Sequence, residues 1–171
     1  MQYNDHPFVG AEQIARVYEI ALLGGHSVAL AWTDTESDLP AEQRRAYEQP
    51  FRKVPTIHET GGIVPIEEAD MIVEITRPDI GQLFRKSETL SDISERVEKA
   101  TENGYCLSDL SDVCYHLLKT ASKKLQLFPV HIKRIIGVAQ TIAQLDGSTI
   151  IEPQHLLEAI QYQSFDRTQS R

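Results

Sequence analysis

The residues with the chemistry to hold a metal ion are few. Cys106, Cys114 and His116 lie close in sequence, but their spacings of eight and two differ from those of the cysteines in zinc sites. On one helix, Cys114 and His116 would also point about 200° apart. Two isolated cysteines in a chain without a secretion signal are more typical of reduced, structural thiols. We therefore expect no metal site and no disulfide.

Nucleophilic chemistry has no support in the sequence either. No G-x-S-x-G segment is present, so the sharp turn that presents a catalytic serine is not predicted. The histidines that could act as bases are scattered along the chain: His6, His26, His58, His116, His131 and His155. We therefore predict no hydrolytic triad.

Basic residues gather in one segment, where they could form an interaction surface. Residues 1–106 contain 10 Lys plus Arg and 19 Asp plus Glu, whereas residues 107–171 contain 7 and 6. The acidic first half repels phosphates at long range, so nucleic acid could bind only through the second half. The alternative for the cluster is a solvated polar face. Its members are Lys119, Lys123, Lys124, Lys133 and Arg134.

Composition predicts an ordinary globular protein of one or two domains. The chain has 171 residues, of which 41% are hydrophobic and 25% are charged. No apolar run approaches the roughly 20 residues of a membrane-spanning helix. The first residues, MQYNDHPF, lack the basic and apolar regions of a signal peptide. We expect a cytoplasmic protein without a membrane partner.

Residues 107–165 have the clearest helical periodicity, and the pattern predicts three helices. Apolar residues in the first helix recur at spacings of three and four, which places them on one stripe. This stripe consists of Leu107, Leu110, Val113, Cys114, Leu117, Leu118, Ala121 and Leu125.

The other two helices of this segment have recognisable ends. The second starts at Pro129, whose fixed φ suits a first helical position, and ends at Gly147. The third starts at Pro153 and runs to about Ser164. Between them, residues 148–151 are expected to form a loop or a single extended turn.

The first half predicts a mixture of helices and strands. A helix ends at Gly25, and residues 27–32, SVALAW, follow as a continuous apolar run, typical of a strand covered on both faces. Residues 71–76, MIVEIT, predict a second strand. Helices are expected at residues 41–48 and 91–102, the latter with Ile93, Val97 and Ala100 facing inward.

The run IIGVAQTIAQLDGSTIIEPQHLLEAIQYQSFDR resembles the C-terminal helical lid of magnesium-chelatase-like AAA+ ATPases. In that family, VARTIADLDGS is followed by I-x-P-x-H-(L/I)-x-E-A-(L/I)-Q-Y-R. The matching positions are Val138, Ala139, Thr141, Ile142, Ala143, residues 145–148, Pro153, His155, Glu158, Ala159, Gln161 and Tyr162. The family's first helix and Gly-Gly-His turn are matched by Val9, Gly10, Glu12, Glu19, Ile20, Ala21, Gly24, Gly25 and His26.

The nucleotide-binding motifs of that family are not found. Where its strand leads into GxxxxGK(S/T), residues 33–40 read TDTESDLP, with no glycine, no lysine and three carboxylates. The acidic magnesium pair has only Glu67 and Glu68 as a weak equivalent, and a solvent-exposed turn is the favoured alternative for them. Val130 occupies the position of the sensor arginine. We infer that the chain cannot bind ATP in the family manner, needs no cofactor and is not an enzyme.

The resemblance implies an α+β, mostly helical chain. Residues 1–86 would be a small, truncated α/β remnant of an AAA+ core, and residues 87–171 a lid-type bundle of three to four helices. We expect a non-catalytic module that acts through protein contacts, with itself or with an intact AAA+ ATPase. Two alternatives remain: a nucleic-acid-associated accessory protein that uses the basic cluster, and a weak ATP-binding protein.

Overall fold

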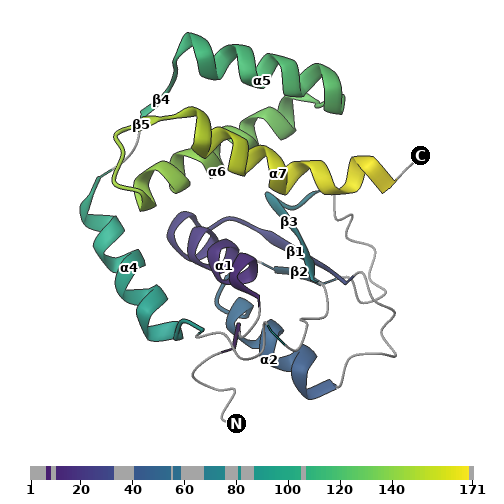
Figure 1. Ribbon diagram of the computed structural model, residues 1–171, viewed down its shortest axis with the longest axis vertical. Coiled ribbons are helices and arrows are strands. Elements are labelled where there is room, and N and C mark those ends of the chain that lie inside the picture. The colour runs from purple at the N-terminus through teal and green to yellow at the C-terminus, as the bar shows by residue number, and fades with distance from the viewer. Residues whose placement is uncertain are drawn as a thin grey trace.

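A small parallel sheet and a set of helices pack together in the computed structural model (Figure 1). The structure describes residues 7–8, 11–32, 41–54, 56–58, 68–75, 81, 87–104 and 107–169. The sheet with its flanking helices forms an α/β unit, and the remaining helices form a second unit beside it. The chain is thus an α+β protein that is mostly helical, as predicted.

The α/β unit is built around a three-stranded parallel sheet with the order β2-β1-β3. Parallel neighbours need a crossover connection, and α2 lies in the connection between β1 and β2. The elements are α1 (Glu12–Gly24), β1 (Val28–Trp32), α2 (Ala41–Phe51), β2 (Thr56–His58) and β3 (Met71–Ile75). In the register, Val28 of β1 lies opposite both Thr56 of β2 and Met71 of β3.

The central strand β1 is covered on both faces, which confirms the prediction from its continuous apolar run. Successive side chains of a strand point to opposite faces. Val28 and Leu30 belong to the main core, whereas Ala29 and Ala31 pack in a second, smaller cluster with Ile72. Both faces of the strand are therefore buried.

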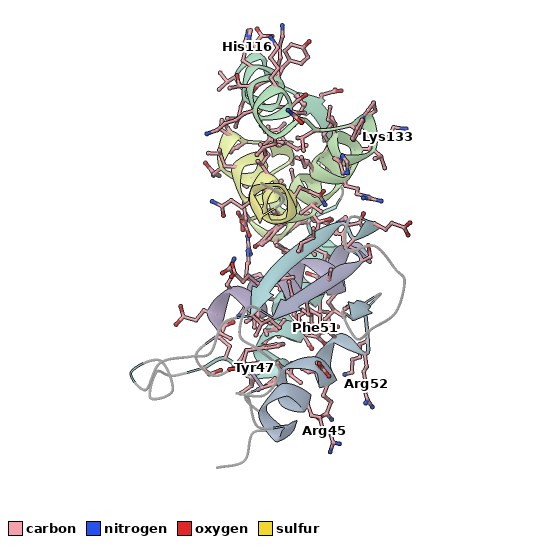
Figure 2. All side chains as sticks on the ribbon, turned by 90° about the vertical axis from the view of Figure 1, so that its right-hand side faces the viewer. Arg45, Tyr47, Phe51, Arg52, His116 and Lys133 are labelled. Carbon is pink, nitrogen blue, oxygen red and sulfur yellow. The ribbon has the colours of Figure 1, made fainter. Side chains whose placement is uncertain are left out.

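Aromatic residues hold α1 and α2 together. The rings of Phe8, Tyr18 and Phe51 lie with their centroids 5.4 to 6.0 Å apart, in tilted and edge-on arrangements. Phe51 and Tyr47 of α2 are buried, whereas Arg45 of the same helix and Arg52, just after it, extend into solvent (Figure 2). This one-sided pattern fixes the face that α2 turns to the core.

The helical unit follows from residue 87 onward. Its elements are α4 (Leu90–Glu102), β4 (Leu107–Leu110), α5 (Asp112–Leu125), α6 (Pro129–Leu145), β5 (Ile150–Ile151) and α7 (Pro153–Gln169). The predicted starts at Pro129 and Pro153 are confirmed, and α4 buries Ile93, Val97 and Ala100 as expected. Helix α7 continues beyond the predicted end at Ser164.

The prediction for the first helix of this unit was partly wrong. Residues Leu107 to Leu110 form β4, which pairs in parallel with β5, so residues 148–151 contribute a strand as well as a turn. The helix begins only at Asp112, because the side chain of Ser111 accepts a hydrogen bond from the Cys114 N–H and caps it. Val113 is 63% exposed and does not belong to the buried stripe.

One main core connects the two units. It includes Tyr18 of α1 and Val73 of β3 together with Ile142 of α6 and Leu156 of α7. The predicted boundary between residues 86 and 87 stays a prediction, since residues 82–86 lie outside the described part of the chain. Among the described residues, no helix is long and apolar enough to span a membrane.

Candidate functional site

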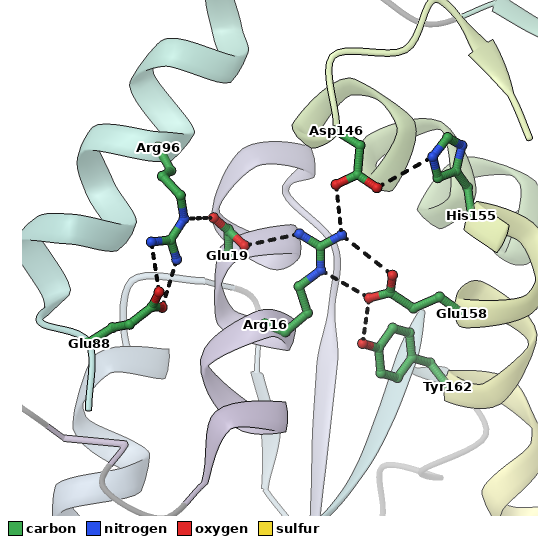
Figure 3. Close-up of polar contacts among 8 residues, drawn as sticks. All are labelled: Arg16, Glu19, Glu88, Arg96, Asp146, His155, Glu158 and Tyr162. Atoms are coloured by element: carbon green, nitrogen blue, oxygen red, sulfur yellow. Dashed lines mark hydrogen bonds and ion pairs between the residues drawn. The ribbon is translucent and has the colours of Figure 1, made fainter. Parts of the chain in front are cut away.

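The helical unit is joined to the α/β unit by an ionic network centred on Arg16 of α1 (Figure 3). Its guanidinium donates to Glu158 of α7 at 3.1 Å, to Asp146 after α6 at 3.2 Å and to Glu19 of α1 at 3.2 Å. Burial alone would lower the pKa of Arg16, but the hydrogen bond and charge of Glu158, with Asp146, raise it overall. The guanidinium therefore stays charged and links three elements.

Glu19 extends the network to α4. The residue is only 4% exposed, and its carboxylate accepts a second hydrogen bond from Arg96 Nε at 2.7 Å. Arg96 also forms a bidentate pair with Glu88, at 3.0 and 2.7 Å, and the hydrogen bond to Glu88 is the main cause of its raised pKa. A buried carboxylate is tolerated here because two arginines compensate its charge.

Tyr162 closes the network on the side of α7. Its hydroxyl donates to Glu158 Oε1 at 3.0 Å, one turn earlier in the same helix. Burial raises the pKa of Tyr162, and the neighbouring Glu158 carboxylate raises it further. The phenol therefore remains a hydrogen-bond donor throughout the neutral range.

His155 caps a helix and touches the same network. The ring is 1% exposed, and its Nδ1 accepts from the Glu152 N–H at 3.1 Å. Nε2 must then carry the proton, and it lies 3.4 Å from Asp146 Oδ2. Helix α6 starts in the same way, with His131 Nδ1 accepting from the Phe128 N–H at 3.1 Å. In both x-Pro-x-His segments the imidazole therefore takes the place of a capping-box carboxylate.

A second joint connects the turn after α1 with α6. His26 Nε2 lies 2.8 Å from Thr141 Oγ1, and the same hydroxyl donates to the Gly137 carbonyl at 3.3 Å. A Cβ at Gly24 would clash with His26 Nε2 and would lie 2.6 Å from Thr141 Oγ1. Only glycine fits beside this contact. The pKa of His26 is lowered by burial, which the charge of Asp70 partly opposes.

Asp70, just before β3, anchors the third contact. Its Oδ2 accepts from both the backbone N–H and the hydroxyl of Ser27, each at 2.9 Å, and Oδ1 lies 3.6 Å from Arg134 Nε of α6. Gln163 of α7 donates to the carbonyls of Ala69 and Asp70, at 3.0 and 2.6 Å. Helices α6 and α7 are thus tied to the starts of two neighbouring strands.

Two of the three joints lie at the amino edge of the sheet. The turn at His26 precedes β1, and Asp70 precedes β3. Ligands of parallel sheets usually bind at the opposite edge, outside the carboxyl ends of the strands. The segments that follow those ends, residues 33–40, 59–67 and 76–80, lie outside the described residues. These two joints therefore lie on the edge away from the expected position of a phosphate loop.

The structure divides the predicted basic cluster. Lys119, Lys123 and Lys124 are exposed on α5, and Lys133 is exposed on α6. Figure 2 shows Lys133 extending outward from the helical unit. Arg134 is turned toward Asp70, and its side chain is only 19% exposed. As an interaction surface, the cluster stays a prediction.

The other predicted positions do not assemble into a site. Cys114 is buried, with its Sγ 3.5 Å from the Ile151 carbonyl, while Cys106 is outside the described residues. Glu68 is exposed and Glu67 is not described. Val130, at the sensor position, is 48% exposed. Within the described ranges, no group of three His, Cys, Asp or Glu side chains could hold a metal ion.

The comparison with known families matches the helical unit. Residues 82–163 fit the family model described as Magnesium chelatase, subunit ChlI C-terminal. These residues are similar to a magnesium-chelatase C-terminal domain. This domain supplies Arg96, Asp146, Glu158, Tyr162 and the caps of α6 and α7. No curated protein matches the chain.

The motif residues in the sequence do not indicate which of them pair with one another. Glu19, His155, Glu158 and Tyr162 were recognised as matches, yet their role in a single network depends on contacts across the chain. Arg16, the centre of the network, was not identified at all. One signal was available: Glu19 lies between the buried apolar residues of α1, and a carboxylate in that position needs a cationic partner.

Proposed function

We propose that this chain is a non-catalytic, magnesium-chelatase-like module that acts in the cytoplasm through contacts with protein partners. The observation that carries the proposal is the sequence of residues 33–40, TDTESDLP, which follows β1 directly. A triphosphate needs close backbone approach and a counter-charge. This segment offers neither, and its three carboxylates repel phosphate.

The contacts of the helical unit support a structural role. Arg134 of α6 pairs with Asp70 of its own chain at 3.6 Å. Glu158 and Asp146 hold Arg16, and His155 caps α7. These side chains fix the position of the helices, and a fixed helical surface is what a binding module requires.

A nucleic-acid-associated role is the second candidate. It is favoured by the exposure of Lys119, Lys123, Lys124 and Lys133, with the aromatic ring of Tyr115 beside Lys119. The formal net charge of −8 weakens it, because the chain as a whole repels a polyanion. Retention of DNA that falls steeply with salt, and that is lost when the lysines are replaced, would support this candidate.

Calorimetric titration with Mg-ATP tests the main proposal. We expect no binding heat at micromolar nucleotide, whereas an intact magnesium-chelatase ATPase, titrated in parallel, should bind. Micromolar binding by the present chain would overturn the proposal. A steady-state assay for phosphate release under the same conditions separates binding from hydrolysis, which addresses the weak ATP-binding alternative directly.

A further inference from the structure

Two exposed charge stripes of opposite sign have the same spacing on two different helices. Helix α4 carries Glu95, Glu98 and Glu102, at spacings of three and four. Helix α5 carries two lysines, Lys119 and Lys123, preceded by the imidazole of His116, also at spacings of three and four. Each stripe therefore spans about 10 Å along its helix axis at 1.5 Å per residue.

Both stripes lie on the outermost line of their helices. On α4 the buried residues are Ile93, Val97 and Ala100, and a turn of 100° per residue puts the glutamates on the opposite side. On α5 the buried residues are Cys114 and Leu118, and the basic stripe is opposite to them in the same way. All six side chains of the two stripes are exposed.

Neither stripe finds an ion-pair partner among the described residues of the chain. The neighbouring Arg96 is occupied by Glu88 and Glu19. Lys119 lies over the Tyr115 ring, with its Nζ 6.0 Å from the ring centroid. The charges of the two stripes thus remain available to another molecule.

The two stripes are on different parts of the molecule. Helix α4 packs against α1 and α6, whereas α5 packs against α7 and β4 and forms one end of the molecule (Figure 1). His116 lies at the outer tip in Figure 2. One copy therefore cannot bring its own stripes together, although two copies can.

We propose that the α5 stripe of one copy docks on the α4 stripe of a second copy. In a parallel alignment, Glu95 faces His116, Glu98 faces Lys119 and Glu102 faces Lys123. Binding to nucleic acid would account for the basic stripe alone, whereas a second copy accounts for both stripes and their common spacing. The inference rests on the proposed function and names one partner and one surface for it.

Such a contact joins different faces of the two copies. Each added copy leaves one free stripe of each sign, so assembly continues until a ring closes or a chain ends. Exposed ion pairs each contribute up to about fivefold to an association constant, and salt screens them. The association is therefore weak, depends on concentration and is lost at high ionic strength, and the net charge of −8 on each copy opposes it at long range.

Charge reversal tests the contact. Lys119→Glu with Lys123→Glu makes the α5 stripe acidic, and Glu98→Lys with Glu102→Lys makes the α4 stripe basic. In each double variant both stripes have the same sign, so we expect the association constant to fall at least about tenfold. Sedimentation at low ionic strength measures the change, and circular dichroism verifies that the exposed substitutions leave the fold intact.

The equimolar mixture of the two double variants is the decisive sample. One variant has two acidic stripes and the other has two basic stripes, so every stripe of one variant can pair with a stripe of the other. The mixture should therefore recover the association of the unchanged chain. In about 1 M NaCl, where the screening length is about 3 Å, this association should disappear. A mixture that does not recover overturns the inference.

Other outcomes distinguish this inference from the proposed function. An unchanged chain that stays monomeric at low ionic strength overturns self-association, but it leaves the proposed function to be decided by the Mg-ATP titration. The inference also fails if both double variants associate like the unchanged chain. DNA retention that is lost only with Lys119→Glu and Lys123→Glu, with no self-association, would assign the basic stripe to nucleic acid instead.

Discussion

The charges at the joint and those on the outer helices have opposite environments. Glu19 is 4% exposed and accepts hydrogen bonds from Arg16 and Arg96. Glu98 and Lys119, by contrast, are exposed, and neither has an ion-pair partner in the described part of the chain. Charges of the first kind hold the units together, and charges of the second kind are available for association. The same residue types thus serve stability in one region and contact in the other.

The largest effect is expected from removing the buried carboxylate. Glu19→Ala leaves Arg16 and Arg96 facing each other without compensation, and it should reduce the free energy of unfolding by about 3 kcal/mol. The matched control is Glu98→Ala, which should change the free energy of unfolding by less than about 0.5 kcal/mol. Urea denaturation measures both. Equal effects of the two substitutions would abolish the distinction between the regions.

A smaller loss is expected at the turn that follows α1. Gly24→Ala places a Cβ against His26 Nε2 and Thr141 Oγ1, so the free energy of unfolding should fall by about 2 kcal/mol. Adding His26→Ala removes the nearer obstruction, and the double variant should lose less than the sum of the two single changes. Strict additivity in denaturation experiments would show that the close approach is unimportant.

The hydrogen bond between Tyr162 and Glu158, at the edge of the network, should contribute less to the free energy of unfolding. Tyr162→Phe removes the hydroxyl that donates to Glu158, while Arg16 continues to bind this carboxylate. We expect a loss of about 1 kcal/mol in thermal or urea unfolding. If the double variant with Glu158→Gln loses as much as the two single variants combined, the contact is not coupled to the network.

The pH dependence gives the smallest and most specific effect. Burial lowers the pKa of His26, so the unfolded chain binds a proton more readily than the folded one. The contribution of His26 is therefore fully present above its unfolded pKa of about 6.5 and is lost as the pH falls below that value. His26→Asn should flatten this part of the stability profile. An unchanged profile would exclude His26 as its source.

The local elements could be predicted because their signals are local. Pro129 and Pro153 mark helix starts by their fixed φ, and Gly25 marks a helix end with a φ of 65°. The continuous apolar run of β1 correctly indicated a strand buried on both faces. In each case the necessary information lies within a few residues.

The missed features depend on distant partners. Leu107 and Leu110 fit a helical spacing, but Ser111 caps the helix after them, and pairing with β5 makes them a strand. Arg16 meets Glu158 across 142 positions of sequence, which no local pattern indicates. The second charge stripe, by contrast, could have been found from helical spacing alone, since Glu95, Glu98 and Glu102 repeat the spacing of the basic residues.

The attachment of α6 and α7 to the starts of β1 and β3 divides the sheet into two ends with different roles. Changes at Gly24 or Asp70 would disturb the contact between the two units directly. The carboxyl ends of the same strands lie at the other edge, so substitutions there would leave both of these contacts in place. The support of the helices and the chemistry of the opposite edge are therefore physically separate.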